Sequence, residues 1–163
     1  MNLRPVVTGD APLLYEIYAA TRTDELALTG WSEGQKSAFT RMQFALQTAH
    51  YDTHYPEARR WVVEVDGQPA GRLYVDRRPE RIDVIDIALL PAFRGRGIGS
   101  ALLRGVLDDA DRSGQPVTIY VEENNPARRL YERMGFEELK TEGVYRQLVR
   151  KPRVAETAGA IGD

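Results

Sequence analysis

The chain of 163 residues contains no cysteine, and this absence excludes several kinds of chemistry. A thiol nucleophile, a disulfide framework and a zinc–thiolate site all require cysteine side chains. Apolar runs long enough to cross a membrane are also missing, and the N-terminal residues show no signal-peptide pattern. We therefore expect a soluble cytoplasmic protein that does not enter a membrane.

An excess of charge of one sign is missing as well. The chain carries 22 lysines and arginines against 24 acidic residues, a formal net charge of −2. Because the basic residues are scattered along the chain, a nucleic-acid-binding surface is not expected. The length suits one domain with a sizeable core. We predict a single domain over residues 1–150 and a disordered Ala/Gly/Glu-rich tail over residues 151–163.

A glycine-rich segment is the most informative feature that is present. Residues 94–99 read Arg-Gly-Arg-Gly-Ile-Gly, between an apolar run over residues 82–90 and a helical pattern that follows. The start of a helix offers unpaired N–H groups and the positive end of the helix dipole, and glycines let a phosphate approach the backbone. The segment therefore predicts a phosphate-binding loop made by Arg94, Gly95, Arg96, Gly97, Ile98, Gly99 and Ser100.

Two familiar phosphate-binding motifs do not fit this segment. The dinucleotide-binding fingerprint needs a third glycine where Ser100 stands when counting begins at Gly95. The P-loop needs a Gly-Lys-Ser/Thr sequence, and no lysine follows here. A nucleotide-binding oxidoreductase is therefore a weak alternative.

The loop resembles another family more closely. The positions of Arg94, Gly97 and Gly99 are similar to the Arg/Gln-x-x-Gly-x-Gly/Ala signature of the GNAT superfamily of N-acetyltransferases. Residues 86–94 resemble the strand that leads into this signature. Residues 125–136, Asn-Pro-Ala-Arg-Arg-Leu-Tyr-Glu-Arg-Met-Gly-Phe, resemble the family's Asn…Leu-Tyr-Glu-x-x-Gly-Phe motif. Two motifs in the right order are more specific than either alone, and the resemblance extends from about residue 4 to residue 149.

The resemblance implies a fold and a cofactor. The fold is a mixed α/β arrangement of about seven strands with about four flanking helices, in which the strands beginning at Ile82 and Val117 splay apart at the cofactor cleft. The glycine-rich loop would bind the pyrophosphate of acetyl-CoA. The backbone of the preceding strand would pair with the pantetheine arm of the cofactor, through Ile87, Ala88 and Leu89.

Further site residues follow from the same resemblance. The N–H group of Leu89 is the candidate donor to the thioester oxygen, a contact that speeds acyl transfer. The family's cofactor-contacting asparagine corresponds to Asn124 when counted from Tyr131 and to Asn125 when counted from Val121. Asn125 is in addition a candidate cap for the helix that follows it.

Catalysis needs a general acid and a base or water relay. Tyr131 corresponds to the family tyrosine beside the cofactor sulfur and would protonate the leaving thiolate. The candidate bases are Asp83 and Asp86 on the strand before the loop, because a carboxylate among apolar neighbours tends to have a raised pKa. Glu122, at the end of the next strand, is a third candidate.

The N-terminal part predicts two helices and offers no decisive substrate signal. Asp10 is a candidate N-cap for the first helix, and the Ser32…Gln35 pair is a capping box for the second. The helical period predicts an apolar face on the second helix, formed by Phe39, Met42, Leu46 and Ala49. Aromatic residues nearby are candidates for the wall of an acceptor site: Trp31, Phe44, Tyr51 and Tyr55. His50 and His54 lie four residues apart, but with no third ligand evident we expect no metal site.

These observations predict an N-acetyltransferase. It would transfer an acetyl group from acetyl-CoA to a primary amine, on a small molecule or a peptide, by direct attack in a ternary complex. The alternative is a non-catalytic module that binds or senses acyl-CoA on the same fold. The chain is expected to act as a monomer or homodimer without a metal, and the acceptor cannot be read from the sequence.

Overall fold

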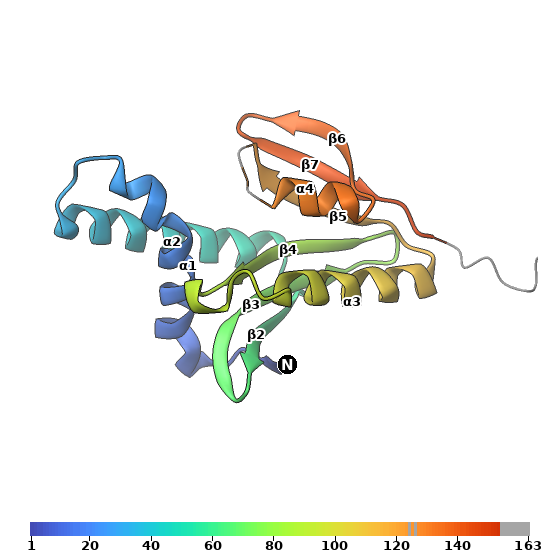
Figure 1. Cartoon of the computed structure of the whole chain (residues 1–163), viewed down its shortest axis with the longest axis horizontal. Helices are drawn as coiled ribbons and strands as arrows, with labels where there is room; N and C mark the ends of the chain where they lie inside the picture. Colours follow the sequence, from blue (N-terminus) through green and yellow to red (C-terminus); the bar gives the residue numbers. More distant parts are fainter. Residues whose placement is uncertain (124, 126, 154–163) are drawn as a thin grey trace, which may run out of the picture. The chain divides into compact units, whose positions relative to one another are not determined.

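The computed structural model describes residues 1–123, 125 and 127–153. Within these residues lie seven strands and four α-helices (Figure 1). Their bounds are β1 (Asn2–Pro5), α1 (Ala11–Ala27), α2 (Glu33–His54), β2 (Arg59–Val65), β3 (Gln68–Arg77), β4 (Ile82–Leu89), α3 (Ile98–Ser113), β5 (Val117–Glu122), α4 (Arg128–Arg133), β6 (Glu137–Glu142) and β7 (Tyr145–Arg150).

The strands form one mixed sheet in the order β1-β2-β3-β4-β5-β7-β6. The pairing of β4 with β5 is parallel and joins Ile82–Val84 to Val117–Ile119. β1 with β2, β2 with β3, β5 with β7 and β6 with β7 are antiparallel. The prediction of a mixed α/β fold with about seven strands is therefore confirmed, whereas the opening between β4 and β5 stays a prediction.

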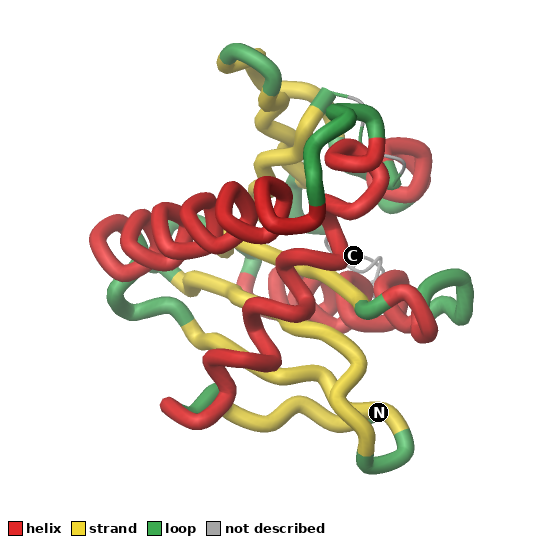
Figure 2. The backbone as a smooth tube through the Cα atoms, turned by 90° about the vertical axis from the view of Figure 1, so that its left-hand side faces the viewer, coloured by secondary structure: helices red, strands yellow, loops and turns green. Residues whose placement is uncertain are grey.

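The chain divides into two compact units, Met1–Asp76 with Asp86–Gly99 and Arg77–Ile85 with Ser100–Asp163. In the first unit, Ile17 of α1 and Val62 and Val63 of β2 are fully buried. Figure 2 draws the strands of the sheet in yellow, running next to one another. In the second unit, Leu103 of α3 and Val117 of β5 are buried. The predicted domain limits of 1–150 stay a prediction, and most of the predicted tail, residues 154–163, lies outside the described residues.

The second helix begins as predicted but buries a different face. Ser32 Oγ accepts a hydrogen bond from the Gln35 N–H at 3.2 Å, and Gln35 Oε1 accepts one from the Ser32 N–H at 2.9 Å. The predicted apolar face is exposed at all four positions, so that prediction is wrong. The side that faces α1 carries the buried Thr40 and the half-buried Phe44 instead, and the Phe44 ring lies 5.6 Å from that of Tyr15 on α1.

Asp10 stands at the N-cap position of α1 but does not cap the helix. Its carboxylate accepts hydrogen bonds from the Arg4 guanidinium at 2.9 and 2.8 Å and from the Val7 N–H at 2.8 Å. These bonds, that of Arg4 foremost, lower the pKa of Asp10 to about 2. Asp10 therefore ties β1 to the start of α1, which corrects the predicted capping role.

Two chain reversals are defined by local hydrogen bonds and backbone angles. Asp66 and Gly67 join β2 to β3 with φ angles of +51° and +76°, as expected for a tight hairpin. The N-cap position of α4 (Arg128–Arg133) is Ala127 and not Asn125. The Asn125 side chain still makes a bond typical of a cap, because it accepts a hydrogen bond from the Ala127 N–H at 2.7 Å. The other candidate asparagine, Asn124, lies outside the described residues.

Candidate functional site

The glycine-rich loop joins β4 to α3 through a short 3-10 turn, Pro91–Phe93. Gly95 and Gly97 have φ angles of +74° and +79°, a conformation that favours glycine. The N–H groups of Gly95, Arg96 and Gly97 have no hydrogen-bond acceptor among the described residues. Since α3 begins at Ile98, its unpaired first-turn N–H groups follow directly. The loop therefore collects several free donors on one short segment.

The space above these glycines is open. A Cβ atom built on Gly95 or on Gly97 would meet no heavy atom within 4 Å. Glycine is therefore needed there for the backbone conformation, and nothing in the described chain fills the space beside it. Free N–H donors beside open space fit an anion such as a pyrophosphate.

The two arginines of the loop have different surroundings. The Arg94 guanidinium donates to the carbonyl oxygens of Leu89 at 3.0 Å and Ala20 at 3.3 Å. Arg94 therefore ties the loop to β4 and to α1. The Arg96 guanidinium lies 5.2 Å from the centre of the Phe93 ring and is exposed. Arg96 is thus the loop cation with more freedom to meet a phosphate.

The end of β4 is held closely against β3. The Leu90 N–H donates to the Ala70 carbonyl at 2.8 Å. Because successive N–H groups of an extended chain point to opposite edges, the N–H of Leu89 points away from β3. A Cβ on Gly71 would lie only 2.1 Å from the Ala88 carbonyl oxygen, so only glycine permits this approach. The backbone at Ala88 and Leu89 is therefore fixed by close contact with β3.

Asp86 lies in a polar cluster that joins β3, β4 and α2. Its Oδ2 atom accepts hydrogen bonds from Arg72 Nη2 at 2.6 Å and from the Tyr51 hydroxyl at 3.0 Å. Gln47 Oε1 accepts a second bond from Arg72 Nη2 at 2.9 Å. Burial and the nearby Asp86 charge raise the pKa of Tyr51, so its hydroxyl keeps its proton. The other carboxylate oxygen of Asp86 has no hydrogen-bond partner among the described residues.

Arg72 is the member of this cluster that the sequence analysis missed. Its side chain is only 3% exposed. Burial is the largest influence and favours a lower pKa for Arg72, but the Asp86 charge, the neighbouring Tyr74 and Tyr51 and the hydrogen bond to Asp86 together raise the pKa. A single arginine within the apolar run Ala-Gly-Arg-Leu-Tyr-Val of β3 is the signal that could have revealed it, because a buried cation requires a buried partner.

Asp83 has partners on both carboxylate oxygens. Oδ1 accepts hydrogen bonds from Arg81 Nε at 2.8 Å and from the Thr118 hydroxyl, and Oδ2 lies 3.6 Å from Arg78 Nε. Of the Asp83 and Asp86 carboxylates, only that of Asp86 therefore keeps an oxygen that can accept a further hydrogen bond without losing a partner among the described residues. The third candidate, Glu122, is the last residue of β5.

Tyr131 lies on α4 and is almost fully buried. Gly135, with a φ angle of +95°, ends this helical segment and reverses the chain. The reversal brings the Phe136 N–H to the Tyr131 carbonyl at 3.0 Å and places the two rings 5.9 Å apart. The tyrosine, glycine and phenylalanine of the motif thus form one local unit.

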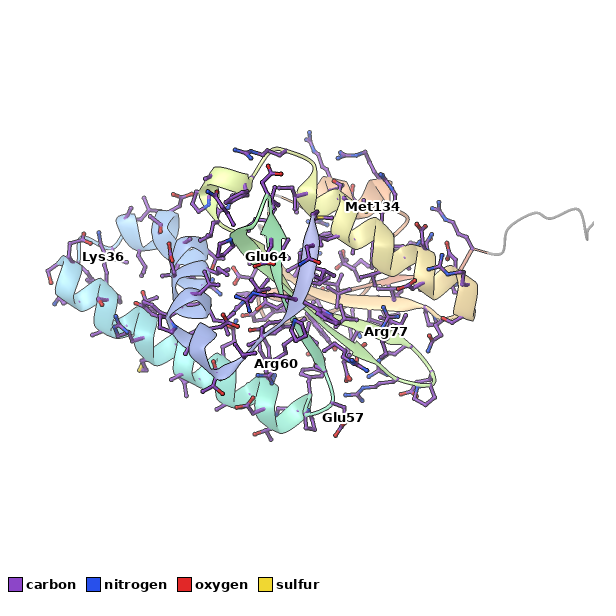
Figure 3. The ribbon with its side chains drawn as sticks, turned by 90° about the horizontal axis from the view of Figure 1, so that it is seen from below. Lys36, Glu57, Arg60, Glu64, Arg77 and Met134 are labelled. Atoms are coloured by element: carbon purple, nitrogen blue, oxygen red, sulfur yellow. The ribbon has the colours of Figure 1, made fainter. Side chains whose placement is uncertain are left out.

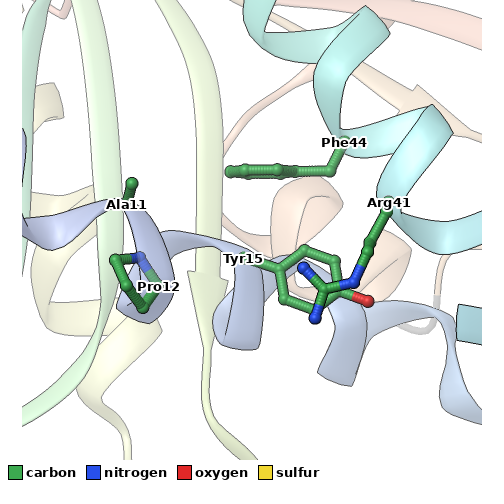
Figure 4. Close-up of a pocket in the computed structure, with 5 residues that line it drawn as sticks. All are labelled: Ala11, Pro12, Tyr15, Arg41 and Phe44. Atoms are coloured by element: carbon green, nitrogen blue, oxygen red, sulfur yellow. The ribbon is translucent and has the colours of Figure 1, made fainter.

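A pocket of about 510 Å³ lies between α1 and α2 (Figure 4). Its lining is mostly apolar and comprises Ala11, Pro12, Tyr15, Arg41 and Phe44. The Arg41 guanidinium lies 4.3 Å from the centre of the Tyr15 ring. Among the aromatic residues predicted to wall an acceptor site, Phe44 lines this pocket and Trp31, Tyr51 and Tyr55 do not.

The His50 and His54 rings lie 4.4 Å apart. Within residues 1–123, 125 and 127–153, no three histidine, cysteine or acidic side chains gather in a way that suits a metal ion. In the same residues, no helix has the length and apolar character needed to cross a membrane.

Comparison of the sequence with known proteins identifies a family and several relatives. The Acetyltransferase (GNAT) family matches residues 14–136. An uncharacterized N-acetyltransferase of Methanocaldococcus jannaschii is 28% identical over 127 residues, which cover 62% of this chain and 56% of that protein. An N-alpha-acetyltransferase of Sulfurisphaera tokodaii is 33% identical over 101 residues, covering 52% of this chain and 59% of that protein. The chain thus spans little more than half the length of these relatives.

Solved structures share the fold. The PaiA N-acetyltransferase from Thermoplasma acidophilum, in complex with coenzyme A, superposes with a TM-score of 0.69 and 17% identity, over 92% of this chain and 98% of that one. A GNAT family acetyltransferase from Elizabethkingia anophelis with acetyl-CoA bound gives a TM-score of 0.60 and 15% identity, over 92% of this chain and 97% of that one. With the family match over most of its length, the chain belongs to the GNAT family of acetyltransferases.

Proposed function

We propose that this protein is an acetyl-CoA-dependent N-acetyltransferase that acts on a primary amine. The observation that carries the proposal is the loop over residues 95–97, where free N–H groups adjoin open space at the start of α3. Donors of this kind suit the pyrophosphate of a CoA ester. The names of the relatives and the bound CoA and acetyl-CoA of the structural neighbours are consistent with it.

We assign residues of this chain to the steps of acetyl transfer. Bound acetyl-CoA supplies the acetyl group as a thioester. The N–H of Leu89 would donate to the carbonyl oxygen as it gains negative charge. The neutral amine would attack the carbonyl carbon, the carbon–sulfur bond would break, and Tyr131 would give its proton to the thiolate. Direct attack in a ternary complex fits a chain without cysteine, because no cysteine can carry the acetyl group.

The base that takes the proton from the amine is the next question. We favour Asp86 over Asp83, because Asp86 keeps one carboxylate oxygen without a partner and both oxygens of Asp83 are engaged. Replacement by Asn preserves the shape of either side chain and removes its charge. Asp86→Asn is expected to remove the basic group from the pH–rate profile, and Asp83→Asn to leave that profile unchanged. The opposite result would assign the base to Asp83.

The activity is tested by release of free CoA in the presence of a library of amines. Because the chain has no cysteine, a thiol reagent detects only the CoA that is set free, without background from the protein. We expect thiol release that depends on one class of amine, with a mass gain of one acetyl group on that amine. Tight binding of acetyl-CoA without turnover on any amine would instead support the non-catalytic binding module.

A further inference from the structure

Helix α2 carries an apolar stripe that the described chain leaves exposed. Phe39, Met42 and Leu46 are 36, 50 and 59% exposed, and Ala49 is exposed as well. Their spacing of three, four and three residues places them on one face of the helix. Trp31, 39% exposed, extends the stripe, since its ring lies 5.2 Å from that of Phe39. We call these five residues the α2 stripe; Figure 3 marks Lys36 near the N-terminal end of α2.

From Phe39 to Ala49 the residues of the α2 stripe carry no charge, whereas Glu33 and Lys36 lie between Trp31 and Phe39. Between Lys36 and Asp52, the only side chain with a permanent charge is Arg41. Its guanidinium is directed to the Tyr15 ring of α1, in the pocket of Figure 4, and so lies off the stripe. A face with charges of one sign repels an identical face, whereas an uncharged apolar face can meet its own copy.

The exposed area suits an interface between two copies. At these exposures, the four large side chains of the stripe offer on the order of 400 Å² of apolar surface. A standard interface buries about 800 Å² on each partner, of which about 56–65% is apolar. The stripe alone therefore supplies most of the apolar area that one side of a stable interface needs.

We propose that the protein forms a two-fold symmetric homodimer in which the α2 stripes of two copies pack against each other, with the helices antiparallel. In this antiparallel arrangement, the positive end of one helix dipole lies beside the negative end of the other. The bulky end of the stripe, at Phe39, then meets the small end, at Ala49 of the partner subunit, which suits close packing. The proposal is independent of the proposed activity, because no residue of the stripe belongs to the glycine-rich loop or to the Asp86 cluster.

The oligomeric state of the full chain tests this proposal. Light scattering or sedimentation velocity is expected to give twice the monomer mass of 18.4 kDa at micromolar concentration. Leu46→Arg should weaken the dimer at least 100-fold and give a folded monomer, since Leu46 is largely exposed. Its melting temperature should fall only by the stabilisation that association gives the wild type. The matched control is Leu139→Arg on β6, where the leucine is equally exposed at 60%, and it should remain dimeric.

A second pair of variants gives an independent measurement. Because the chain has no cysteine, Ala45→Cys introduces a single thiol beside the middle of the stripe. Mild oxidation should link this variant into a disulfide dimer that survives denaturation. Ala101→Cys, at an exposed position on α3, should form no such link. A wild-type chain that stays monomeric at high micromolar concentration, or equal behaviour of Leu46→Arg and Leu139→Arg, would overturn the proposal.

Discussion

The most direct test of the glycine-rich loop is a pair of substitutions at Gly97. Both Gly97→Asp and Gly97→Asn place a side chain on a backbone with a φ angle of +79°, a conformation that Asn and Asp tolerate better than other residues with a Cβ. The two variants have nearly the same size and strain, and they differ in one negative charge. Since a Cβ on Gly97 meets nothing within 4 Å, neither variant should clash in the free protein.

The size of the effect follows from Coulomb's law. Two like charges about 4 Å apart repel by about 1 kcal/mol in bulk water and about 4 kcal/mol at the effective dielectric constant of a protein surface. Gly97 is exposed, and a pyrophosphate carries more than one negative charge. We therefore expect Gly97→Asp to bind CoA more weakly than Gly97→Asn by about 1.4–2.8 kcal/mol, or roughly 10- to 100-fold in Kd.

Isothermal titration of CoA and acetyl-CoA against both variants measures this difference. Raising the salt concentration from about 0.1 to 1 M shortens the Debye length from about 10 to 3 Å, so the difference should shrink. Equal melting temperatures would show that strain is matched. If both variants bound CoA equally, in affinity and in salt dependence, the pyrophosphate would not lie at this loop, and the glycine-rich loop would not be the CoA-binding site.

Three further predictions concern catalysis and stability. Tyr131→Phe should lower kcat by about 100-fold or more without changing the affinity for acetyl-CoA. The control Tyr120→Phe, at an exposed position on β5, should leave kcat unchanged. Equal effects of the two substitutions on kcat would contradict the role of Tyr131 as general acid. Gly71→Ala should lower the free energy of unfolding by about 1–3 kcal/mol in urea, because the new Cβ meets the Ala88 carbonyl; a neutral result would show that β3 and β4 are less closely apposed. Asp10→Asn should destabilise the protein by about 1–2 kcal/mol at neutral pH. Because the pKa of Asp10 is lowered from 3.8 to about 2 by folding, its stabilisation is present above pH 3.8 and lost as the pH falls towards 2. The difference between wild type and variant should therefore close in that window, and a difference that persists at pH 2 would exclude this ion pair as its source.

Much of the local geometry of the site depends on residues that are close together in the sequence. The two glycines of positive φ in the loop, the Ser32–Gln35 capping box and the Asp66–Gly67 hairpin each depend on contacts within a few residues. The chain alone therefore specifies them. The motif residues around Tyr131 behave in the same way, since Gly135 reverses the chain over a single turn.

Contacts between distant segments could not be derived in this way. The apolar period of α2 marked one face for burial, yet α1 packs on the face with Thr40 and Phe44, and the marked face stays exposed. Helix period shows that a face is apolar, but only the neighbouring elements decide which face they cover. The predicted cap at Asp10 failed for a related reason, because an ion pair with Arg4 on β1 competes for its carboxylate.

The sequence by itself determined the family of folds and the position of the glycine-rich loop, because strand, glycine turn and helix start are adjacent in the chain. Only the tertiary structure distinguished the two candidate bases. Asp83 and Asp86 look alike as residues on one strand. The partners of Asp86, Arg72 and Tyr51, lie on other elements, whereas Asp83 meets Thr118 of β5 and the nearby Arg78 and Arg81. A buried charge takes its properties from the groups that surround it, and folding alone brings those groups together.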